Sequence, residues 1–327
     1  MDNYNNRDKI LLILYKSFDE WVSGEEISHE LGVSRTAVWK NINVLRDKGY
    51  LIESSNKLGH KLISSNNILT EFEIKRSLTT SVFGRREIAI LDSTGSTNFD
   101  AFQRASSGAP EGSIVLADRQ ESGKGRLGRA WSSPSGKNIY LSIVTRPSIP
   151  PYVAPRLTIV TAVALSDTLI QAGAGGHRIK WPNDILYGEK KISGILTEMK
   201  GDTDSIDYII TGIGVNINSS EDDYPPEIRD TITSLRIILK RDFERNLFIS
   251  SFLENFEKQY NSFLKGEFKN ILSVWKERAD IINRDIRIKQ FNETFTGKVI
   301  ELNEDGNLVV DTGDSLRIVN SGDIHYI

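Results

Sequence analysis

A glycine-rich basic segment carries the clearest chemical signal in this chain. Residues 120–129 read Gln-Glu-Ser-Gly-Lys-Gly-Arg-Leu-Gly-Arg, so cations alternate with glycines. Glycine lets the backbone approach a ligand closely and leaves N–H groups free to face an anion. Lysine and arginine add the positive charge that holds a phosphate or a carboxylate. The segment therefore predicts an anion-binding loop, with a solvated surface loop as the alternative.

Two familiar phosphate-binding motifs do not explain this loop. Residues 123–128 formally match G-x-G-x-x-G, but the dinucleotide fingerprint requires a helix immediately after it. Residues 131–136 are instead rich in Ser, Pro and Gly, which predicts a turn. A Walker A loop needs Ser or Thr after its Gly-Lys pair, whereas Lys124 is followed by Gly125.

Four further segments combine glycines with polar side chains near predicted strand ends. Residues 180–184 (Lys-Trp-Pro-Asn-Asp) surround a proline turn, and residues 190–196 (Lys-Lys-Ile-Ser-Gly-Ile-Leu) begin a strand with lysines at its mouth. Residues 212–216 (Gly-Ile-Gly-Val-Asn) end a strand with an amide that can read a base edge. Residues 92–98 (Asp-Ser-Thr-Gly-Ser-Thr-Asn) supply small hydrogen-bonding groups. Taken singly, each segment also fits ordinary turn chemistry.

The elements that must position these segments are a mixture of helices and strands. Apolar spacing predicts helices over residues 72–78, 156–172, 248–263 and 268–278, and strands over residues 87–91, 113–117, 192–198 and 208–214. From residue 286 onward, short strands separated by turn residues at 304–307 and 312–314 predict a small all-β module.

The N-terminal segment predicts a winged helix-turn-helix. Ser23 and Ser34 are plausible N-caps, and apolar stripes outline three helices before Gly49. Residues 50–53 and 60–63 then resemble the two strands of a wing joined by a polar loop. Residues 64–67 (Ser-Ser-Asn-Asn) predict a linker.

Charge within this segment is polarised. Residues 1–30 carry a net charge of −4, whereas residues 31–64 carry +4, which suggests one face that meets a polyanion. We expect DNA contacts from the third helix and the wing, with Arg35 and Asn43 suited to bases and the lysines to phosphates. The candidate DNA-binding residues are Ser34, Arg35, Thr36, Lys40, Asn43, Lys57 and Lys61. A protein-interaction module without DNA is the alternative.

Composition limits the possible chemistry. The 327 residues suffice for two or three domains, and 39% hydrophobic and 26% charged residues are ordinary for a soluble globular protein. The absence of cysteine excludes disulfides, thiolate zinc sites and cysteine nucleophiles. Four histidines show no metal-ligand spacing, and no nucleophile elbow supports a serine hydrolase. The first residues lack a signal-peptide pattern, so we expect a cytoplasmic protein without a membrane partner.

Together the segments resemble one family, the biotin protein ligases that carry an N-terminal DNA-binding domain and also act as biotin operon repressors. The resemblance covers nearly the whole chain and rests on Gly-Lys-Gly-Arg-Leu-Gly-Arg, Lys-Trp-Pro-Asn-Asp, Lys-Ile-Ser-Gly-Ile-Leu and Gly-Ile-Gly-Val-Asn, in that order. It implies a multidomain α+β fold. The implied parts are a winged helix-turn-helix at 1–64, a linker at 65–71, a mixed-sheet, class II synthetase-like ligase domain at 72–280, and an SH3-like β-barrel at 281–327.

The resemblance also implies an activity. Such an enzyme activates biotin with ATP and Mg²⁺ to biotinyl-5′-AMP, then transfers biotin to a lysine of a biotin carboxyl carrier domain of the acetyl-CoA carboxylase or pyruvate carboxylase type. Biotinyl-AMP would serve as corepressor, favouring a homodimer that binds operator DNA, and no prosthetic group is implied. Phosphoryl chemistry of this kind needs positioning and charge neutralisation more than a protein base, which suits a site rich in Lys and Arg.

Carried over to this sequence, the resemblance assigns roles to individual residues. Lys191 and Arg126 would be catalytic, and Asp184 would lie near the Mg²⁺ that arrives with ATP, with no fixed metal site. The implied biotin-binding residues are Ser96, Thr97, Asn98, Gln120, Gly123, Lys124, Arg126, Lys191 and Gly194. The implied ATP- and adenylate-binding residues are Arg126, Arg129, Trp131, Lys180, Asn183, Asp184 and Asn216.

Two features of the sequence depart from the family pattern, and two alternative functions compete with this interpretation. Many family members have arginine where this chain has Lys124, and lysine lacks the bidentate fork. The run at residues 93–98 holds two Ser-Thr pairs, and we choose the second because Asn98 follows it. The rivals are a lipoate or octanoate ligase and a catalytically silent, biotin-sensing transcription factor. Retention of Lys191 and of the full basic loop argues against the silent protein.

Overall fold

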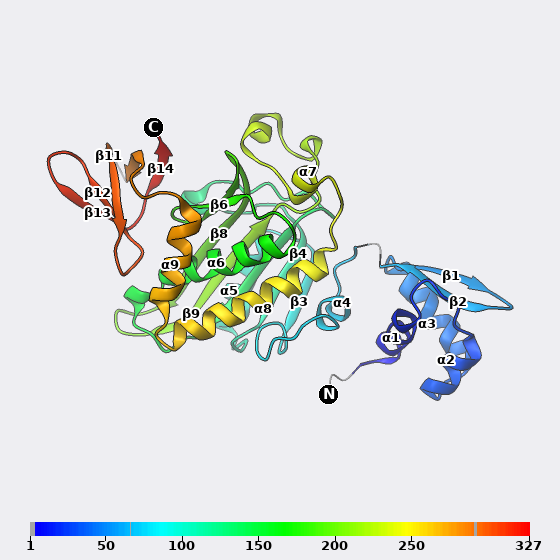
Figure 1. Ribbon diagram of the computed structural model, residues 1–327. Coiled ribbons are helices and arrows are strands. Elements are labelled where there is room, and N and C mark those ends of the chain that lie inside the picture. The colour runs from blue at the N-terminus through cyan, green and yellow to red at the C-terminus, as the bar shows by residue number, and fades with distance from the viewer. Residues whose placement is uncertain (1–3, 66, 291–292) are drawn as a thin grey trace. The chain divides into compact units, whose positions relative to one another are not determined.

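The computed structural model describes residues 4–65, 67–290 and 293–327. The chain forms two compact units, Met1–Phe72 and Glu73–Ile327. The first unit contains α1 (Asn6–Lys16), α2 (Gly24–Leu31), α3 (Arg35–Asp47) and the antiparallel pair β1 (Leu51–Ser55) and β2 (Gly59–Ser64). This is the three-helix and wing arrangement that the sequence predicts (Figure 1).

Local sequence explains the helix ends of the first unit. Ser23 Oγ accepts a hydrogen bond from Glu26 N at 3.0 Å, and Ser34 Oγ accepts one from Ala37 N at 3.2 Å, so both serines are N-caps. Gly32 ends α2 in the left-handed conformation, with φ at +64°. The predicted caps of α2 and α3 are therefore confirmed.

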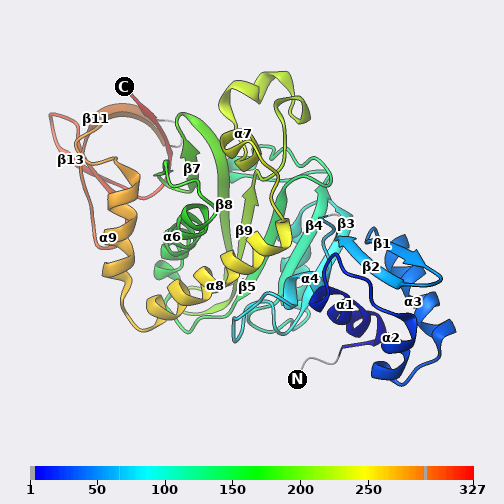
Figure 2. The same cartoon turned by 45° about the vertical axis from the view of Figure 1, so that its right-hand side comes forward.

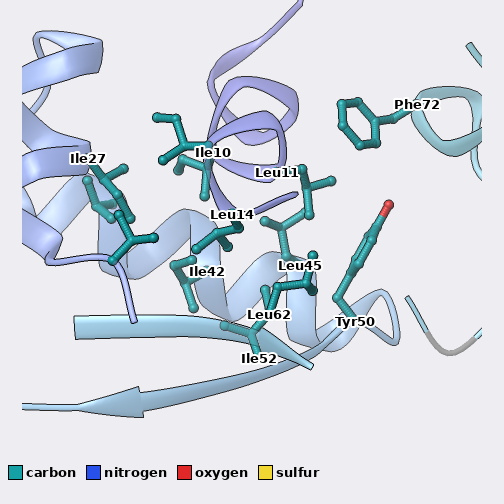
Figure 3. Packing of buried hydrophobic residues seen from close by; sticks show 13 residues of the cluster. Ile10, Leu11, Leu14, Ile27, Ile42, Leu45, Tyr50, Ile52, Leu62 and Phe72 are labelled. Atoms are coloured by element: carbon teal, nitrogen blue, oxygen red, sulfur yellow. The ribbon is translucent and has the colours of Figure 1, made fainter. Parts of the chain in front are cut away.

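The core of the first unit lies between the three helices and the wing (Figure 3). Ile10 and Leu14 of α1 meet Ile42 of α3, and the wing closes the core from below with Ile52 and Leu62. All five side chains are buried, because the helices place apolar residues at three- and four-residue spacing and the strands turn every second residue to the same face. Burial of this stripe leaves the polar side of α3 facing outward.

The second unit is built on a seven-stranded sheet with the order β3-β4-β5-β9-β8-β7-β6. β3 and β4 are parallel and all other neighbours are antiparallel, so the mixed sheet expected from the sequence is confirmed. The strands are β3 (Ile88–Thr94), β4 (Ile114–Gln120), β5 (Ile139–Thr145), β6 (His177–Lys180), β7 (Asp184–Tyr187), β8 (Lys190–Gly201) and β9 (Ile206–Val215).

Helices cover both faces of this sheet. Adjacent residues of β8 contact different helices: Thr197 bonds Thr158 of α6, whereas Glu198 bonds Asn98 of α5. Because neighbouring strand residues face opposite sides, α5 and α6 lie on opposite faces. Figures 1 and 2 show α6 and α8 crossing the same face. The helices of this unit are α5 (Thr97–Ser106), α6 (Arg156–Gln171), α7 (Leu235–Leu239), α8 (Arg245–Leu264) and α9 (Phe268–Ala279), and α4 (Glu71–Lys75) spans the unit boundary.

One helical stretch, Pro151–Gln171, is long and apolar enough to cross a membrane by composition alone. Most of its apolar side chains are buried inside the second unit, where α6 packs against the sheet and α8. Such a helix is a normal core helix of a folded domain.

The C-terminal residues form an antiparallel sheet with the order β13-β12-β11-β10-β14. Its strands are β10 (Asp285–Gln290), β11 (Glu293–Leu302), β12 (Leu308–Asp311), β13 (Leu316–Val319) and β14 (Asp323–Tyr326). The predicted all-β module is therefore present. The expected closed barrel is not found among the described residues, because β13 and β14 occupy the two ends of the sheet without pairing with each other.

Two other expectations need correction. The helix expected over residues 72–78 spans Glu71–Lys75, and the helix Thr97–Ser106 was not expected at all. Its polar start, Thr-Asn-Phe-Asp, masks the apolar positions Ala101 and Ala105 that pack on the sheet. Alanine contributes little to an apolar pattern, although it is a strong helix former.

Candidate active site

A cavity of about 340 Å³ lies in the second unit, above one face of the seven-stranded sheet. All five glycine and polar segments identified from the sequence reach it, among them the end of 92–98, the loop at 120–129, the turn at 180–184 and the strand at 190–196. Gly212 and Gly214 of the fifth segment line it as well. Residues separated by more than a hundred positions therefore share one site.

Three glycines in neighbouring strands, Gly194, Gly212 and Gly214, form the floor of the cavity. One row across the sheet pairs Ser142 with Gly212 and Gly212 with Leu196, and the next row pairs Gly214 with Gly194. A Cβ atom on Gly214 would lie 2.4 Å from the Trp131 ring, and one on Gly194 would lie 2.9 Å from it. These glycines are required because the indole lies directly on the backbone.

The glycine-rich loop is closed at its base by backbone hydrogen bonds. Trp131 N donates to Gly123 O at 2.8 Å, and Gly125 N donates to Arg129 O at 2.7 Å. Its outer end is Leu127, which is 77% exposed and has a φ of +56°. No regular helix follows the loop before β5, so the dinucleotide motif excluded from the sequence is also absent from the structure of these residues.

Two arginines of the loop are attached to other parts of the second unit. Arg126 Nη1 donates to Asn183 Oδ1 at 3.3 Å, and Arg129 forms an ion pair with Asp323 of β14. Asn183 is held in turn, since its Nδ2 donates to Ile195 O at 2.7 Å. The loop therefore lies between the proline turn and the C-terminal sheet.

Lys191 is the cation that the strand β8 presents to the cavity. Its Nζ lies 2.7 Å from Asp184 Oδ1 and 5.2 Å from the centre of the Trp131 ring. A cation above an indole face is attracted by the ring quadrupole. Carboxylate and indole together fix the ammonium group over the glycine floor.

Five cations and two carboxylates line the cavity, which gives it a net positive character. Burial lowers the pKa of the Lys180 ammonium, and the carboxylate of Asp184 partly opposes this effect. Burial likewise lowers the pKa of the Arg126 guanidinium, opposed by Asp323 and Asp184. Partly desolvated cations interact strongly with an anion that enters. The lining cations are Lys124, Arg126, Arg129, Lys180 and Lys191, and the carboxylates are Asp184 and Asp323.

Most residues assigned to biotin or ATP from the sequence line this cavity. They are Ser96, Thr97, Asn98, Gln120, Lys124, Arg126, Arg129, Trp131, Lys180, Asn183, Asp184, Lys191 and Gly194. Of the two Ser-Thr pairs, the second is buried at the cavity, whereas Ser93 is exposed and bonds Glu121. Gly123 lies beside the cavity, where an added Cβ would be 2.8 Å from both Gln120 Nε2 and Trp131 O.

Asn216 is located behind the cavity wall. It is 3% exposed, and its amide lies between Asn138 Nδ2 and Lys191 O, each at 3.4 Å. Contact between Asn216 and a nucleotide would require this pair of long hydrogen bonds to give way.

The C-terminal strand contributes residues to the cavity that the sequence did not predict. Asp323, Ile324 and His325 line the cavity, as do Tyr140 and Trp181. Trp181 Nε1 donates to Gly306 O at 3.2 Å, so the turn between β11 and β12 supports the proline turn from behind. No local pattern marks these C-terminal residues, because they reach the site only through packing of the β module.

The described residues contain no group of three His, Asp or Glu side chains suited to a metal ion. Asp184 is one carboxylate at the cavity. Mg²⁺ is commonly held by one or two carboxylates together with substrate phosphates, so this single side chain fits a metal delivered with ATP.

The candidate DNA-binding residues lie on α3 and the wing of the first unit. Lys40 and Lys57 are exposed, whereas Arg35 pairs with Glu25. Arg46, half-buried in the last turn of α3, donates to Asn43 Oδ1, to Ile52 O and to Ser54 Oγ. It therefore ties the third helix to the wing.

Lys61 differs from the other wing cation. Its Nζ lies 3.1 Å from Asp19 and 3.6 Å from Glu53, and its side chain is only 19% exposed. It is already neutralised by two carboxylates, unlike the exposed Lys57 at the wing tip. Ser34 serves as the N-cap of α3, and Thr36 is exposed on its first turn.

Family models match all three regions of the chain. Residues 89–216 match the biotin/lipoate A/B protein ligase family, residues 6–61 match a helix-turn-helix domain, and residues 281–325 match the biotin protein ligase C-terminal domain. The three matches include the cavity, the winged helix and the β module.

Whole proteins are similar over almost their full length. The bifunctional ligase/repressor BirA of Bacillus spizizenii is 38% identical over 97% of this chain and 98% of its own length. Its Escherichia coli counterpart is 27% identical over 98% and 97%. The structure of Aquifex aeolicus biotin protein ligase in complex with biotin and ATP superposes with a TM-score of 0.63, at 27% identity, over 74% of this chain and 99% of that one. This chain therefore belongs to the bifunctional biotin ligase/repressor family.

Proposed function

We propose that the cavity binds biotin and ATP together and joins them as biotinyl-5′-AMP. A carboxylate oxygen of biotin attacks the α-phosphorus, a new P–O bond forms, and pyrophosphate leaves with the electrons of the broken P–O bond. The amine of a carrier lysine then attacks the acyl carbon, which forms an amide and releases AMP and a proton. The proposal is carried by one observation, the five cations gathered around a single glycine-floored cavity.

Within this proposal Lys191 neutralises charge on the reacting carboxylate and phosphate. Its position next to Asp184 and over Trp131 keeps the ammonium in the cavity before a ligand arrives. Arg126 and Arg129 would contact the phosphates, Lys180 and Asn183 would hold the nucleotide, and Asp184 would hold its Mg²⁺. The metal would supply further neutralisation of phosphate charge.

The acid end of the ligand would lie among Ser96, Thr97, Asn98 and Gln120. Lys124 and the backbone of Gly123 and Gly194 would pack beside it, and Trp131 would border both ligands. Asn216 would read the adenine after a small rearrangement of its hydrogen bonds to Asn138 and Lys191. The carrier would be a biotin carboxyl carrier domain of an acetyl-CoA carboxylase or pyruvate carboxylase.

The adenylate would also act as a corepressor. We infer that it favours a homodimer whose two winged helices bind a palindromic operator, as the two-fold symmetry of such a dimer requires. The C-terminal sheet would be an SH3-like module, and the ligase sheet would be class II synthetase-like. A cytoplasmic location is consistent with substrates and DNA found there.

Adenylation can be tested by pyrophosphate exchange. Labelled pyrophosphate should enter ATP only when biotin and Mg²⁺ are present, with octanoate and lipoate as poor substitutes. Preferred exchange with octanoate or lipoate would identify the chain as the related ligase. If no acid supports exchange, the protein is a sensor without catalysis.

Arg126 gives a second test, of retention of the intermediate. Arg126→Gly should loosen the phosphate contact, so that the reactive adenylate diffuses away and biotinylates lysines of bystander proteins such as serum albumin. The measurement is label on albumin relative to label on a carrier domain in one mixture.

Leu127→Gly is the matched control for Arg126→Gly. It changes the same loop and removes an exposed side chain but no charge. Equal bystander labelling by the two variants would mean that loop flexibility, rather than the guanidinium, controls release. Label confined to the carrier in both would mean that this loop does not retain the adenylate.

A further inference from the structure

The amide of Asn98 has its hydrogen-bonding capacity largely filled by the protein. Its Nδ2 donates to Glu198 Oε2 at 2.7 Å and to Leu196 O at 3.3 Å, which uses both N–H hydrogens. Its Oδ1 accepts from the hydroxyl of Ser142 at 2.6 Å. A ligand can use at most the remaining lone pair of Oδ1.

The amide of Asn98 packs directly against the backbone of the sheet. Ser142, Gly212 and Leu196 form one row across β5, β9 and β8, and Asn98 lies on the glycine in the middle. A Cβ on Gly212 would be 2.0 Å from Asn98 Oδ1, which no side chain could accommodate without displacing the amide. The first turn of α5 is thereby fixed to three strands.

The same serine begins a chain of hydrogen bonds that reaches the cavity. Ser142 is fully buried and gives its one hydroxyl hydrogen to Asn98 Oδ1. Its Oγ therefore accepts the hydroxyl hydrogen of Thr97, whose Oγ1 lies 2.8 Å away. The backbone N–H of Thr97 donates to Gln120 Oε1 at 3.0 Å, and Thr97 Oγ1 lies 3.2 Å from the same oxygen. Because that oxygen accepts, the nitrogen of Gln120 turns the other way and donates to Ser133 Oγ at 3.0 Å.

We propose that Ser142 and Glu198 are positioning residues that fix the orientation of the acid-binding end of the cavity. This proposal rests on the proposed function. By holding Asn98 and Thr97, they set which way the Gln120 amide faces, and thus where the site offers donors and acceptors.

Donors and acceptors with fixed orientations favour a ligand group that both donates N–H and accepts at a carbonyl oxygen. The ring urea of biotin is such a group, whereas a hydrocarbon chain or a dithiolane ring offers neither partner. Two capacities remain in this set, the second N–H of Gln120 and one lone pair of Asn98 Oδ1, and a ligand without polar groups leaves both unpaired. Ser142 and Glu198 thereby contribute to acid selectivity without touching the acid.

Biotin-dependent pyrophosphate exchange tests this directly. Ser142→Ala and Glu198→Ala should each raise the KM for biotin about tenfold, equivalent to about 1.4 kcal/mol. The KM for ATP and the kcat at saturating biotin should stay within about twofold. Glu198→Gln keeps an oxygen that accepts from Asn98, so it should restore a wild-type KM for biotin.

Met199→Ala is the matched control, since Met199 follows Glu198 on β8 and points to the other face. Glu198 itself is exposed, so its variants open no cavity in the core. If Glu198→Ala and Ser142→Ala leave the KM for biotin unchanged, or raise both substrate KM values equally with a lowered Tm, the positioning role is wrong. Absence of exchange in the wild-type protein would overturn the proposed function instead.

Discussion

Lys191→Ala should nearly abolish formation of the adenylate while leaving the protein folded. Removing one charge-assisted contact to a reacting carboxylate and phosphate costs on the order of 2–4 kcal/mol, or roughly 30- to 1000-fold in rate. The Nζ of Lys191 is held over the cavity floor by Asp184 and Trp131, so no other side chain on β8 can take its place. The measurement is kcat/KM for biotin-dependent pyrophosphate exchange.

Lys190→Ala is the matched control. Lys190 precedes Lys191 on the same strand but turns away, and its Nζ lies 3.4 Å from Arg229 O outside the cavity. This variant should keep nearly full activity. Wild-type exchange by Lys191→Ala, or equal losses in the two variants, would remove Lys191 from its catalytic role. A melting curve for each variant separates a catalytic defect from unfolding.

The second large effect concerns DNA. Removing residues 1–72, the first compact unit, should eliminate specific DNA binding, a loss on the order of 10³-fold or more in affinity. Carrier biotinylation should persist, because every residue that lines the cavity belongs to the second unit. The probe is a duplex selected by the full chain from a random-sequence library. A truncated protein that still binds this duplex specifically would place DNA recognition elsewhere.

Substitutions of single lysines in the wing test which cations contact DNA phosphates. Lys57→Ala should weaken binding and reduce the slope of log affinity against log salt by about 1, since one exposed phosphate contact is lost. Lys61→Ala should change the slope much less, because Asp19 and Glu53 already neutralise that cation. Equal slope changes would mean that DNA displaces both carboxylates.

The selected duplex also tests coupling between the two activities. If the adenylate favours the dimer that binds DNA, biotin and ATP together must raise the affinity for DNA, and DNA must tighten adenylate-dependent dimerisation by the same factor. Titrations with and without the two substrates measure this factor. Identical affinities would describe a ligase with an uncoupled DNA anchor.

Much of this protein could be predicted from its sequence because the signals are local. The caps at Ser23 and Ser34 and the apolar stripes of the first three helices act within a few residues, so they identify the winged helix without tertiary information. The chemistry of the glycine-rich loop and of the lysine at the start of β8 is likewise indicated by residues that are contiguous in the sequence. Those segments were sufficient to suggest the family and the reaction.

Only the tertiary structure decided how the pieces meet. The pairing of Ser142 with Gly212 and of Gly212 with Leu196 depends on strand register, which no single strand encodes. Asp323 reaches the cavity from the C-terminal sheet, and Lys61 is neutralised by carboxylates from two other segments. A sequence determines which side chains are available and where helices and turns begin. Burial and long-range pairing determine which of those side chains remain free for a ligand and which are used by the protein itself.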